Sequence, residues 1–249
     1  MAKLEGIIKI QGTLENLTFY KTADGQLVRT KGGVSKNRIK NDPAFKRTRE
    51  NGMEFAESAH AGKLMRTAVG TMLFHAKDRR LSSRMLGIMA QIKNLDTTSI
   101  RGERKVSEGL GTAEGRLLLK GFDFNVHAAF GSVLYVPLSL DTPSGKVTFT
   151  DFIPAEQIMF PEGATHFSMR SAFVNLDFET GVYETTISPL ENRALDNSLT
   201  TLTLTPSAPA TGSGTAIYVL LIEFFQEVNG VQYTLNNGNY NVLNVLDVV

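Results

Sequence analysis

Eight basic side chains between positions 29 and 49 are the residues of this sequence best suited to chemistry. They are Arg29, Lys31, Lys36, Arg38, Lys40, Lys46, Arg47 and Arg49, and the one acidic residue among them is Asp42. A basic run of this kind neutralises phosphates, and the released counterions give an affinity for nucleic acid that depends on salt and not on base sequence. The same run can instead be a solvated face, or it can contact an acidic protein surface.

Nucleic-acid binding is the weaker of these interpretations. Phe45 is the only aromatic residue in the run, so bases would find few stacking partners there. The sequence also carries no helix-turn-helix, zinc-finger, OB or RRM signature. A sequence-non-specific nucleic-acid-binding or packaging protein therefore stays the alternative hypothesis.

No constellation of side chains that would support catalysis accompanies the basic run. The histidines lie far apart, without a partner at metal-ligand spacing: His60, His75, His127 and His166. There is no Gly-x-Ser-x-Gly elbow and no Walker loop. Asp177, Glu179 and Glu184 flank a predicted hairpin, where turn chemistry explains them. Gly212 to Thr215 precedes a predicted strand rather than a phosphate-binding helix. We therefore predict no enzyme activity, no cofactor, no metal site and no small-molecule substrate.

Turn and cap signals predict the elements that position the basic run. Asp24-Gly25 favours a tight turn, and the strands expected on its two sides are Phe19 to Ala23 and Gln26 to Thr30. The polar segment from Val34 to Asn41 has little to bury and is typical of an exposed arm. Asp42 followed by Pro43 indicates a helix start, because the Asp side chain caps open amides and Pro needs no hydrogen bond there.

Two or three helices are expected after this start, because the first could break near Gly62 or Gly70. Apolar residues at helical spacing predict one buried face for the first, and they are Phe45, Gly52, Phe55, Ala56, Ala59, Leu64, Ala68 and Met72. Its glycines weaken it, unless they let another backbone approach closely. A second helix is indicated from about Ser82. The polar, glycine-rich stretch from Asp96 to Arg116 predicts a loop that is mobile or bound to a partner.

From Leu117 onward, period-two alternation and closely spaced turns predict antiparallel β-structure. The candidate strands are Phe122 to Ala128, Val133 to Leu140, Lys146 to Phe152, His166 to Phe178, Val182 to Ile187, Leu199 to Thr205, Ala216 to Val228, Val231 to Leu235 and Tyr240 to Val248. The predicted fold class is α+β. A basic N-terminal β-hairpin and helical region, 1–116, precedes a C-terminal antiparallel β-sandwich, 117–249, of Ig-like or jelly-roll-like type.

Composition indicates an ordinary globular chain, with 42% apolar and 20% charged residues. The sequence contains no cysteine, which fits a reducing compartment. The apolar run near the N-terminus is too short for a signal peptide, and the most apolar window, Ala216 to Phe225, is about half the length of a spanning helix. We therefore expect a cytoplasmic protein that does not contact membranes.

Two parts of the sequence resemble an uncharacterised protein family of Bacteroidetes. The first runs from Gly12 to Gly33 (GTLENLTFYKTADGQLVRTKGG) and continues in Asn41 to Phe45 and Arg47 to Asn51, and the second is Glu223 to Gly230 (EFFQEVNG). The resemblance covers nearly the whole chain and implies a bacterial origin and synthesis in the cytoplasm. It brings no established activity and no catalytic residues.

Charge is split between the two halves of the sequence. Met1 to Asn125 carries 23 Lys and Arg against 13 Asp and Glu, a net charge of +10, and Val126 to Val249 carries 3 against 12, a net charge of −9. Such a chain is complementary to itself, so head-to-tail contacts could propagate from copy to copy.

The leading hypothesis is therefore a non-enzymatic structural protein that self-assembles into a filament, tube or shell. Its basic N-terminal arm would contact the acidic sandwich of a neighbouring copy. The predicted hairpin supports this hypothesis, because an isolated hairpin is marginally stable and should seek a sheet edge. The long connectors Gly32 to Asn41 and Asp96 to Gly115 also fit segments that become ordered on assembly.

Overall fold

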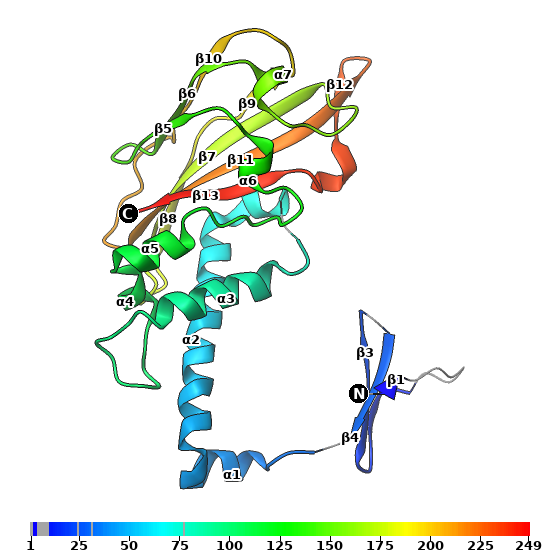
Figure 1. The fold of residues 1–249 in the computed structure, drawn as a ribbon, viewed down its shortest axis with the longest axis vertical. Coiled ribbons are helices and arrows are strands. Elements are labelled where there is room, and N and C mark those ends of the chain that lie inside the picture. Colours follow the sequence, from blue (N-terminus) through cyan, green and yellow to red (C-terminus); the bar gives the residue numbers. More distant parts are fainter. Residues whose placement is uncertain (1, 4–9, 24, 31, 77) are drawn as a thin grey trace. The chain divides into compact units, whose positions relative to one another are not determined.

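The protein contains two compact units, which together combine helices with antiparallel sheets (Figure 1). The computed structural model describes residues 2, 3, 10–23, 25–30, 32–76 and 78–249. The units are Met1–Arg49, called here the N-terminal unit, and Glu50–Val249, called the main unit. The mixed α and β class expected from the sequence is confirmed. The division between Arg49 and Glu50 does not coincide with the boundary expected after residue 116.

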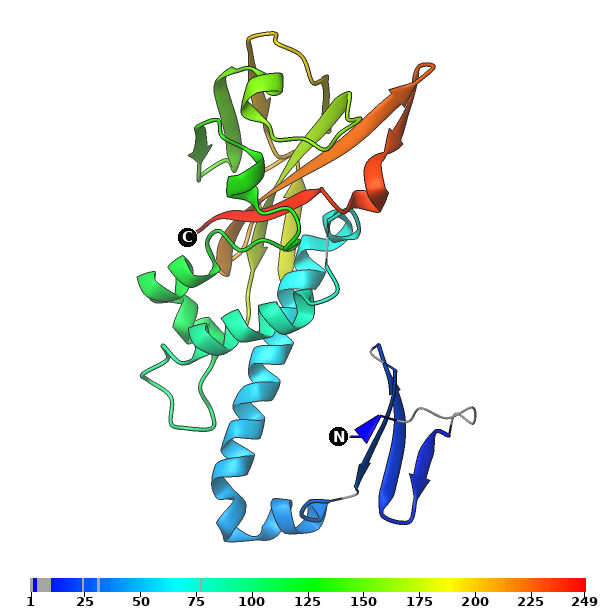
Figure 2. The same cartoon turned by 45° about the vertical axis from the view of Figure 1, so that its right-hand side comes forward.

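The N-terminal unit contains a four-stranded antiparallel sheet (Figure 2). Its strands are β1 (Ala2–Lys3), β2 (Gly12–Leu14), β3 (Leu17–Thr22) and β4 (Gly25–Thr30), in the order β1-β4-β3-β2. The expected hairpin of β3 and β4 is confirmed by the pairing of Thr22 with Gly25. Asp24 of its predicted turn lies outside the described residues. The expectation of an isolated two-stranded hairpin is wrong, because β1 and β2 extend the sheet on both sides.

Two short helices and then a long helix follow this sheet in the chain. The short ones are α1 (Lys36–Asn41) and the 3-10 helix η1 (Pro43–Phe45), and the long one is α2 (Lys46–Val69). Ser35 caps α1 by accepting a hydrogen bond from the Arg38 N–H at 3.3 Å, and Asp42 caps η1 by accepting from the Ala44 N–H at 2.9 Å. The predicted helix start at Asp42 is therefore confirmed. Part of the arm expected at Val34 to Asn41 is helical, and α1 buries no residue.

The main unit places further helices after α2: η2 (Gly70–Phe74), α3 (Leu81–Lys93), α4 (Val106–Leu110) and α5 (Ala113–Leu119). The helix expected from about Ser82 is confirmed as α3. The loop expected from Asp96 to Arg116 is wrong over much of its length, because it contains α4 and the start of α5. Gly109 and Gly115 are buried at a close crossing of helix backbones. No helix within the described ranges has the length and apolar character needed to span a membrane.

The strands of the main unit form two antiparallel sheets. The strands are β5 (Leu138–Asp141), β6 (Lys146–Phe152), β7 (His166–Leu176), β8 (Tyr183–Ile187), β9 (Glu191–Ala194), β10 (Thr200–Leu204), β11 (Thr215–Val228), β12 (Val231–Thr234) and β13 (Val242–Val248). The short helices between them are α6 (Phe130–Val133), α7 (Pro154–Gln157) and η3 (Leu235–Gly238). The long strand β11 pairs with β7, β12 and β13, and β7 also pairs with β8 and β9. The smaller sheet has the order β10-β6-β5.

Most of the expected strands are present, with two corrections. The stretch expected as a strand from Phe122 to Ala128 contains only an isolated bridge, between Asp123 and Asn244. The one expected at Val133 to Leu140 begins in α6 and becomes a strand only at Leu138. The segment from Gly121 to Phe124 does form backbone hydrogen bonds with β13, but the chain turns directly after Phe124.

Buried side chains pack against both faces of the large sheet. On one face, Met65 of α2 and Met85 of α3 belong to a core with Val174 and Val219. On the other face, side chains of the smaller sheet pack with the large sheet, as in the edge-to-face contact of Phe152 and Phe167 at 5.8 Å between ring centroids. The helices therefore share a core with the β-structure.

Replacing Gly109 by Ala should destabilise the main unit by at least about 2 kcal/mol. An added Cβ would lie 2.0 Å from the Ile92 carbonyl oxygen, so α3 and α4 would have to separate. Gly87→Ala is the matched control, because a Cβ at Gly87 of α3 meets nothing within 4 Å. It should stabilise by about 0.5–1 kcal/mol. Urea denaturation followed by circular dichroism measures both, and equal stabilities would contradict the close crossing.

Candidate functional site

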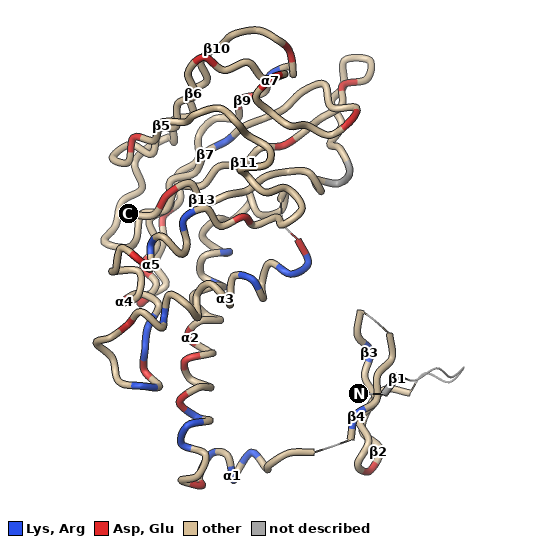
Figure 3. Tube along the Cα trace, viewed as in Figure 1, with Lys and Arg blue, Asp and Glu red and all other residues tan. Residues whose placement is uncertain are grey.

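The predicted interaction residues lie on three elements of the chain (Figure 3). Arg29 is on β4 and stacks over the Tyr20 ring at 5.5 Å. The others are Lys36, Arg38 and Lys40 on α1, and Lys46, Arg47 and Arg49 at the start of α2. Lys31 lies outside the described residues. The structure thus brings six of the eight into one segment, which comprises α1, η1 and the start of α2.

Two of these residues fix the turn between α1 and α2. Arg38 forms an ion pair with Asp42, with 3.0 Å between Nε and Oδ2, and lies over the Phe45 ring at 5.6 Å. Arg49 donates from Nη1 to the carbonyl oxygens of Ile39 and Asp42 at 2.8 and 3.0 Å. The N–H of Ala44 and the Arg38 guanidinium hold the pKa of Asp42 below its usual value. Arg38 and Arg49 therefore have a structural task.

Lys36 and Lys40 have no such task. Both side chains are exposed, and neither forms an ion pair within the part of the chain that the structure describes. They are therefore the residues of α1 best placed to meet a partner of opposite charge.

Helix α2 has the reverse of the polarity expected from its sequence. Glu50, Glu54 and Ser58 are buried in its N-terminal half, whereas Phe55 is 61% exposed and Ala59 is exposed as well. The prediction that Gly52, Phe55, Ala56 and Ala59 form the buried face is wrong. Only the C-terminal half of α2 buries apolar residues as expected, and Gly62 there lets Met85 of α3 approach closely.

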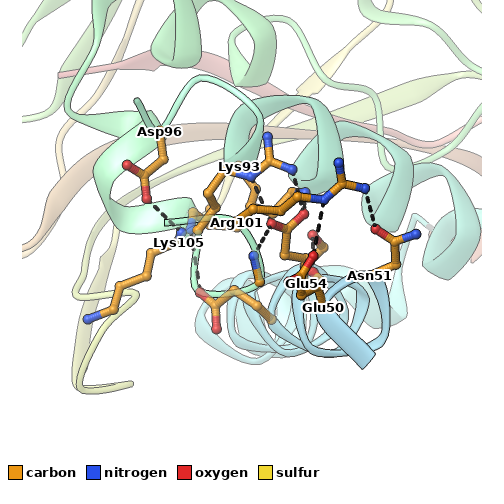
Figure 4. Close-up of polar contacts among 12 residues, drawn as sticks. Glu50, Asn51, Glu54, Lys93, Asp96, Arg101 and Lys105 are labelled. Carbon is orange, nitrogen blue, oxygen red and sulfur yellow. Dashed lines mark hydrogen bonds and ion pairs between the residues drawn. The ribbon is translucent and has the colours of Figure 1, made fainter. Parts of the chain in front are cut away.

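Glu54 is the centre of a buried charge cluster (Figure 4). Its Oε1 accepts hydrogen bonds from the Gly102 N–H and from Nε of Arg104, both at 2.8 Å. Its Oε2 accepts from Nη2 of Arg104 at 2.7 Å and from Nζ of Lys93 on α3. Glu54 is 5% exposed and Lys93 is 6% exposed. The ion pairs therefore join α2, α3 and the segment from 94 to 105 away from water.

Neighbouring side chains extend this cluster (Figure 4). Glu50 pairs with Arg101 at 3.5 Å, and Arg101 donates to the Asn51 side chain at 3.2 Å. Asp96 accepts from the backbone N–H groups of Thr98, Ser99 and Lys105 at 2.9 to 3.0 Å, and from the Thr98 hydroxyl at 2.8 Å. The segment is thus ordered within the chain itself.

The electrostatics of the cluster favour charged carboxylates. The Arg104 guanidinium, opposed by burial and aided by Lys93 and the Gly102 N–H, lowers the pKa of Glu54 to about 2. Burial acts to raise the pKa of Asp96, but hydrogen bonds from Ser99, Lys105 and Thr98 together keep it lowered. A general acid or base needs a pKa nearer to the working pH. The cluster is therefore suited to holding structure and not to transferring protons.

Other candidate residues occupy separate places. His75 pairs with buried Glu223 at 2.9 Å, and His166 pairs with Glu227 at 3.6 Å. His60 and His127 are exposed. Among the described residues, no three His, Asp or Glu side chains lie close enough to hold a metal ion. Of the carboxylates beside the predicted hairpin, Asp177 makes turn contacts and accepts from the Glu179 N–H at 2.8 Å. The Glu179 carboxylate forms an ion pair with Lys105, and the Glu184 carboxylate accepts from the Thr211 N–H at 2.6 Å.

A cavity of about 460 Å³ lies beside α3 and is lined by apolar side chains such as Ile88 and Phe122. The charged groups at its edge are already engaged. Arg84 pairs with Asp78, Lys120 pairs with Asp247 at 3.0 Å, and Asp123 accepts from the Asn244 side chain at 2.8 Å. The cavity therefore offers a ligand little beyond apolar surface.

Comparison with known proteins finds no match to the chain among family models, curated proteins or solved structures. This result agrees with the expectation of a family without an established function, and it brings no activity or site residue from a relative. The geometry described above therefore carries the functional argument.

Replacing Glu54 by Gln should destabilise the main unit by about 3 kcal/mol at neutral pH. The pKa of Glu54 is lowered from 4.5 in the unfolded chain to about 2 in the folded one, and each pKa unit corresponds to about 1.4 kcal/mol. This stabilisation is complete above the unfolded value and is lost as pH falls toward the folded value. The difference between wild type and variant should therefore shrink between pH 4.5 and 2 in urea titrations.

Glu103→Gln is the control for this experiment, because Glu103 is an exposed carboxylate in the same segment. It should leave stability nearly unchanged at every pH. A difference between wild type and Glu54→Gln that stays constant from pH 7 to 2 would contradict the assignment of a charged Glu54.

Proposed function

We propose that the protein is a non-enzymatic structural subunit that assembles with copies of itself, through its N-terminal unit, into a filament, tube or shell. The observation that carries this proposal is a sheet whose described residues form no buried core. In the N-terminal unit, none of the described residues from 10 to 49 is buried. A folded sheet needs a covered apolar face to be stable, so a second surface should complete it.

One face of the sheet carries apolar side chains on three neighbouring strands. Residues directly opposite each other in an antiparallel pair share a face, and β2, β3 and β4 pair Leu14 with Leu17 and Phe19 with Val28. These four residues are called here the apolar sheet face. Leu14 is 64% exposed and Leu17 is 39% exposed. Apolar side chains displayed together in this way are typical of a contact surface.

Net charge also differs between the two compact units. The N-terminal unit carries 11 Lys and Arg against 4 Asp and Glu, a net charge of +7. The main unit carries 15 against 21, a net charge of −6. Opposite charge on two units of one chain favours contact between the N-terminal unit of one copy and the main unit of the next.

We also propose that the two sheets of the main unit form a β-sandwich, of the Ig-like or jelly-roll-like type expected from the sequence. The side chains shared between the smaller and larger sheets support this classification. The absence of cysteine from the sequence fits the cytoplasm as the place of assembly.

The segment from Asp96 to Gly115 does not support assembly in the way that its sequence suggested. The segment from Asp96 to Gly115 is ordered by Glu54, Asp96 and its own helices, so it does not wait for a partner. The proposal therefore depends on the N-terminal unit and on the opposite net charges of the two units.

Nucleic-acid binding through the residues from Arg29 to Arg49 stays the alternative. The exposed side chains of Lys36 and Lys40 on α1 favour it, since exposed lysines can contact phosphates. The apolar sheet face has no role in phosphate binding, and for this reason self-assembly is the stronger proposal.

Purified protein should show a mass that rises with concentration and falls at high salt, because opposite charges on the surface are screened. Reversing Lys36 and Lys40 to Glu should weaken this association. Arg79→Glu combined with Lys146→Glu is the matched control, since it makes the same change in net charge at exposed positions of the main unit. Light scattering after size exclusion measures all three proteins.

A wild-type protein that stays monomeric at every concentration and salt would contradict self-assembly. Titration with duplex DNA distinguishes the alternative in the same samples. DNA binding that weakens steeply with salt and disappears in the Lys36 and Lys40 variant, in a monomeric protein, would replace assembly by nucleic-acid binding.

A further inference from the structure

Helix α2 presents an uncharged face to solvent over its first turns in the main unit. None of the exposed residues between positions 51 and 60 is Asp, Glu, Lys or Arg: they are Asn51, Gly52, Met53, Phe55, Ala56, Ala59 and His60. Gly52, Phe55, Ala56 and Ala59 recur at intervals of three and four, which places them on one side of the helix. These four residues are called here the α2 face.

The exposure of the α2 face follows from the burial of the glutamates on another side of the helix. The Glu54 carboxylate, which could have made an adjacent side of the helix polar, is buried against Arg104 and Lys93. Glu57 is half-buried and accepts from the Val106 N–H at 3.4 Å. A solvated helix normally turns its charges outward and its apolar side chains inward. The charge cluster thus fixes α2 with Phe55 outward, 61% exposed.

The shape of the α2 face suits close contact with a sheet. A Cβ added at Gly52 would meet nothing within 4 Å, and Ala56 and Ala59 are small. Phe55 is the one large side chain among the four. A helix with such a stripe packs well on the apolar side of a β-sheet, which is one of the standard layer arrangements of domains.

We propose that the α2 face of one copy receives the apolar sheet face, Leu14, Leu17, Phe19 and Val28, of a second copy. This inference rests on the proposed function and names the surface that the N-terminal unit contacts. Leu14 and Leu17 of the sheet face and all four residues of the α2 face are exposed within their own units, and the two units have opposite net charge. The second copy's N-terminal unit is therefore the occupant that this chain itself supplies.

The contact is heterologous, because a sheet on one copy meets a helix on the next. Each copy then offers one face of each kind. Contacts of this type close into a ring or continue as an open chain, according to the rotation between neighbours. The arrangement requires no second kind of subunit.

Single-cysteine variants test this contact directly, because the chain contains no cysteine. We would mix a Leu14→Cys protein with a Phe55→Cys protein of different tag length, and oxidise mildly. A disulfide that joins the two can form only between copies. Leu14→Cys mixed with Val231→Cys is the matched control, since Val231 is 50% exposed on a separate apolar site at β12.

Non-reducing gels should show the mixed product for positions 14 and 55 and at most a trace for positions 14 and 231. A product dominated by pairs of Leu14→Cys copies would overturn the inference in favour of sheet-to-sheet pairing. Equal yields at positions 55 and 231 would overturn it in favour of unspecific collision.

Ala56→Glu combined with Ala59→Glu gives a second measurement. Both positions are exposed on a helix, and Glu is a good helix former, so circular dichroism and unfolding should be unchanged. The inserted charges should weaken self-association by about tenfold or more and abolish the mixed disulfide. Undiminished association in this variant would overturn the inference while leaving self-assembly intact. A wild type that never associates would instead defeat the proposed function.

Discussion

The burial of the Glu54 carboxylate is the constraint that sets both the orientation of α2 and the position of the segment from 94 to 105. A buried carboxylate is tolerated only with opposite charges and full hydrogen bonding, and Arg104, Lys93 and the Gly102 N–H supply both. Two consequences follow from this one requirement. The segment from 94 to 105 is drawn onto α2, and α2 is rotated so that its apolar residues face outward. The ordered segment from 94 to 105 and the exposed apolar face of α2 therefore have the same cause, which is the burial of Glu54.

The sequence alone predicted the elements whose signals are local. Asp42 and Pro43 marked a helix start, the turn at Asp24-Gly25 marked a hairpin, and period-two alternation marked the strands from Lys146 onward. Each of these signals depends on a few neighbouring residues, so no knowledge of distant contacts was needed. The contacts of Arg38 and Arg49 around Asp42 were not predictable. The sequence does not show whether a basic side chain binds a group of its own chain or a group of another molecule.

The errors share a physical origin in long-range contacts. Gly109 and Gly115 suggested a loop, yet they serve a close crossing of helices that only the tertiary structure creates. Phe55 and Ala59 suggested a buried face. Their apolar spacing does not reveal that glutamates on another side of the same helix form ion pairs inside the protein and are buried instead. The stripe of glutamates, Glu50, Glu54 and Glu57, has helical spacing and was visible in the sequence. Its partners Lys93 and Arg104 are 39 and 50 positions away from Glu54, and no pattern in a single sequence links them.

The position of β13 has a consequence for the order of events during synthesis. Val242, Leu243 and Val245 are fully buried, and β13 joins β11 on one side and the segment from Gly121 to Phe124 on the other. The apolar sides of α2 and α3 pack against a core that includes this strand. The ribosome must therefore release residues 242–248 before the main unit can close, whereas the strands of the N-terminal unit emerge long before. In a nascent chain, the residues of the N-terminal sheet are therefore available well before the main unit, including its part of α2, can fold.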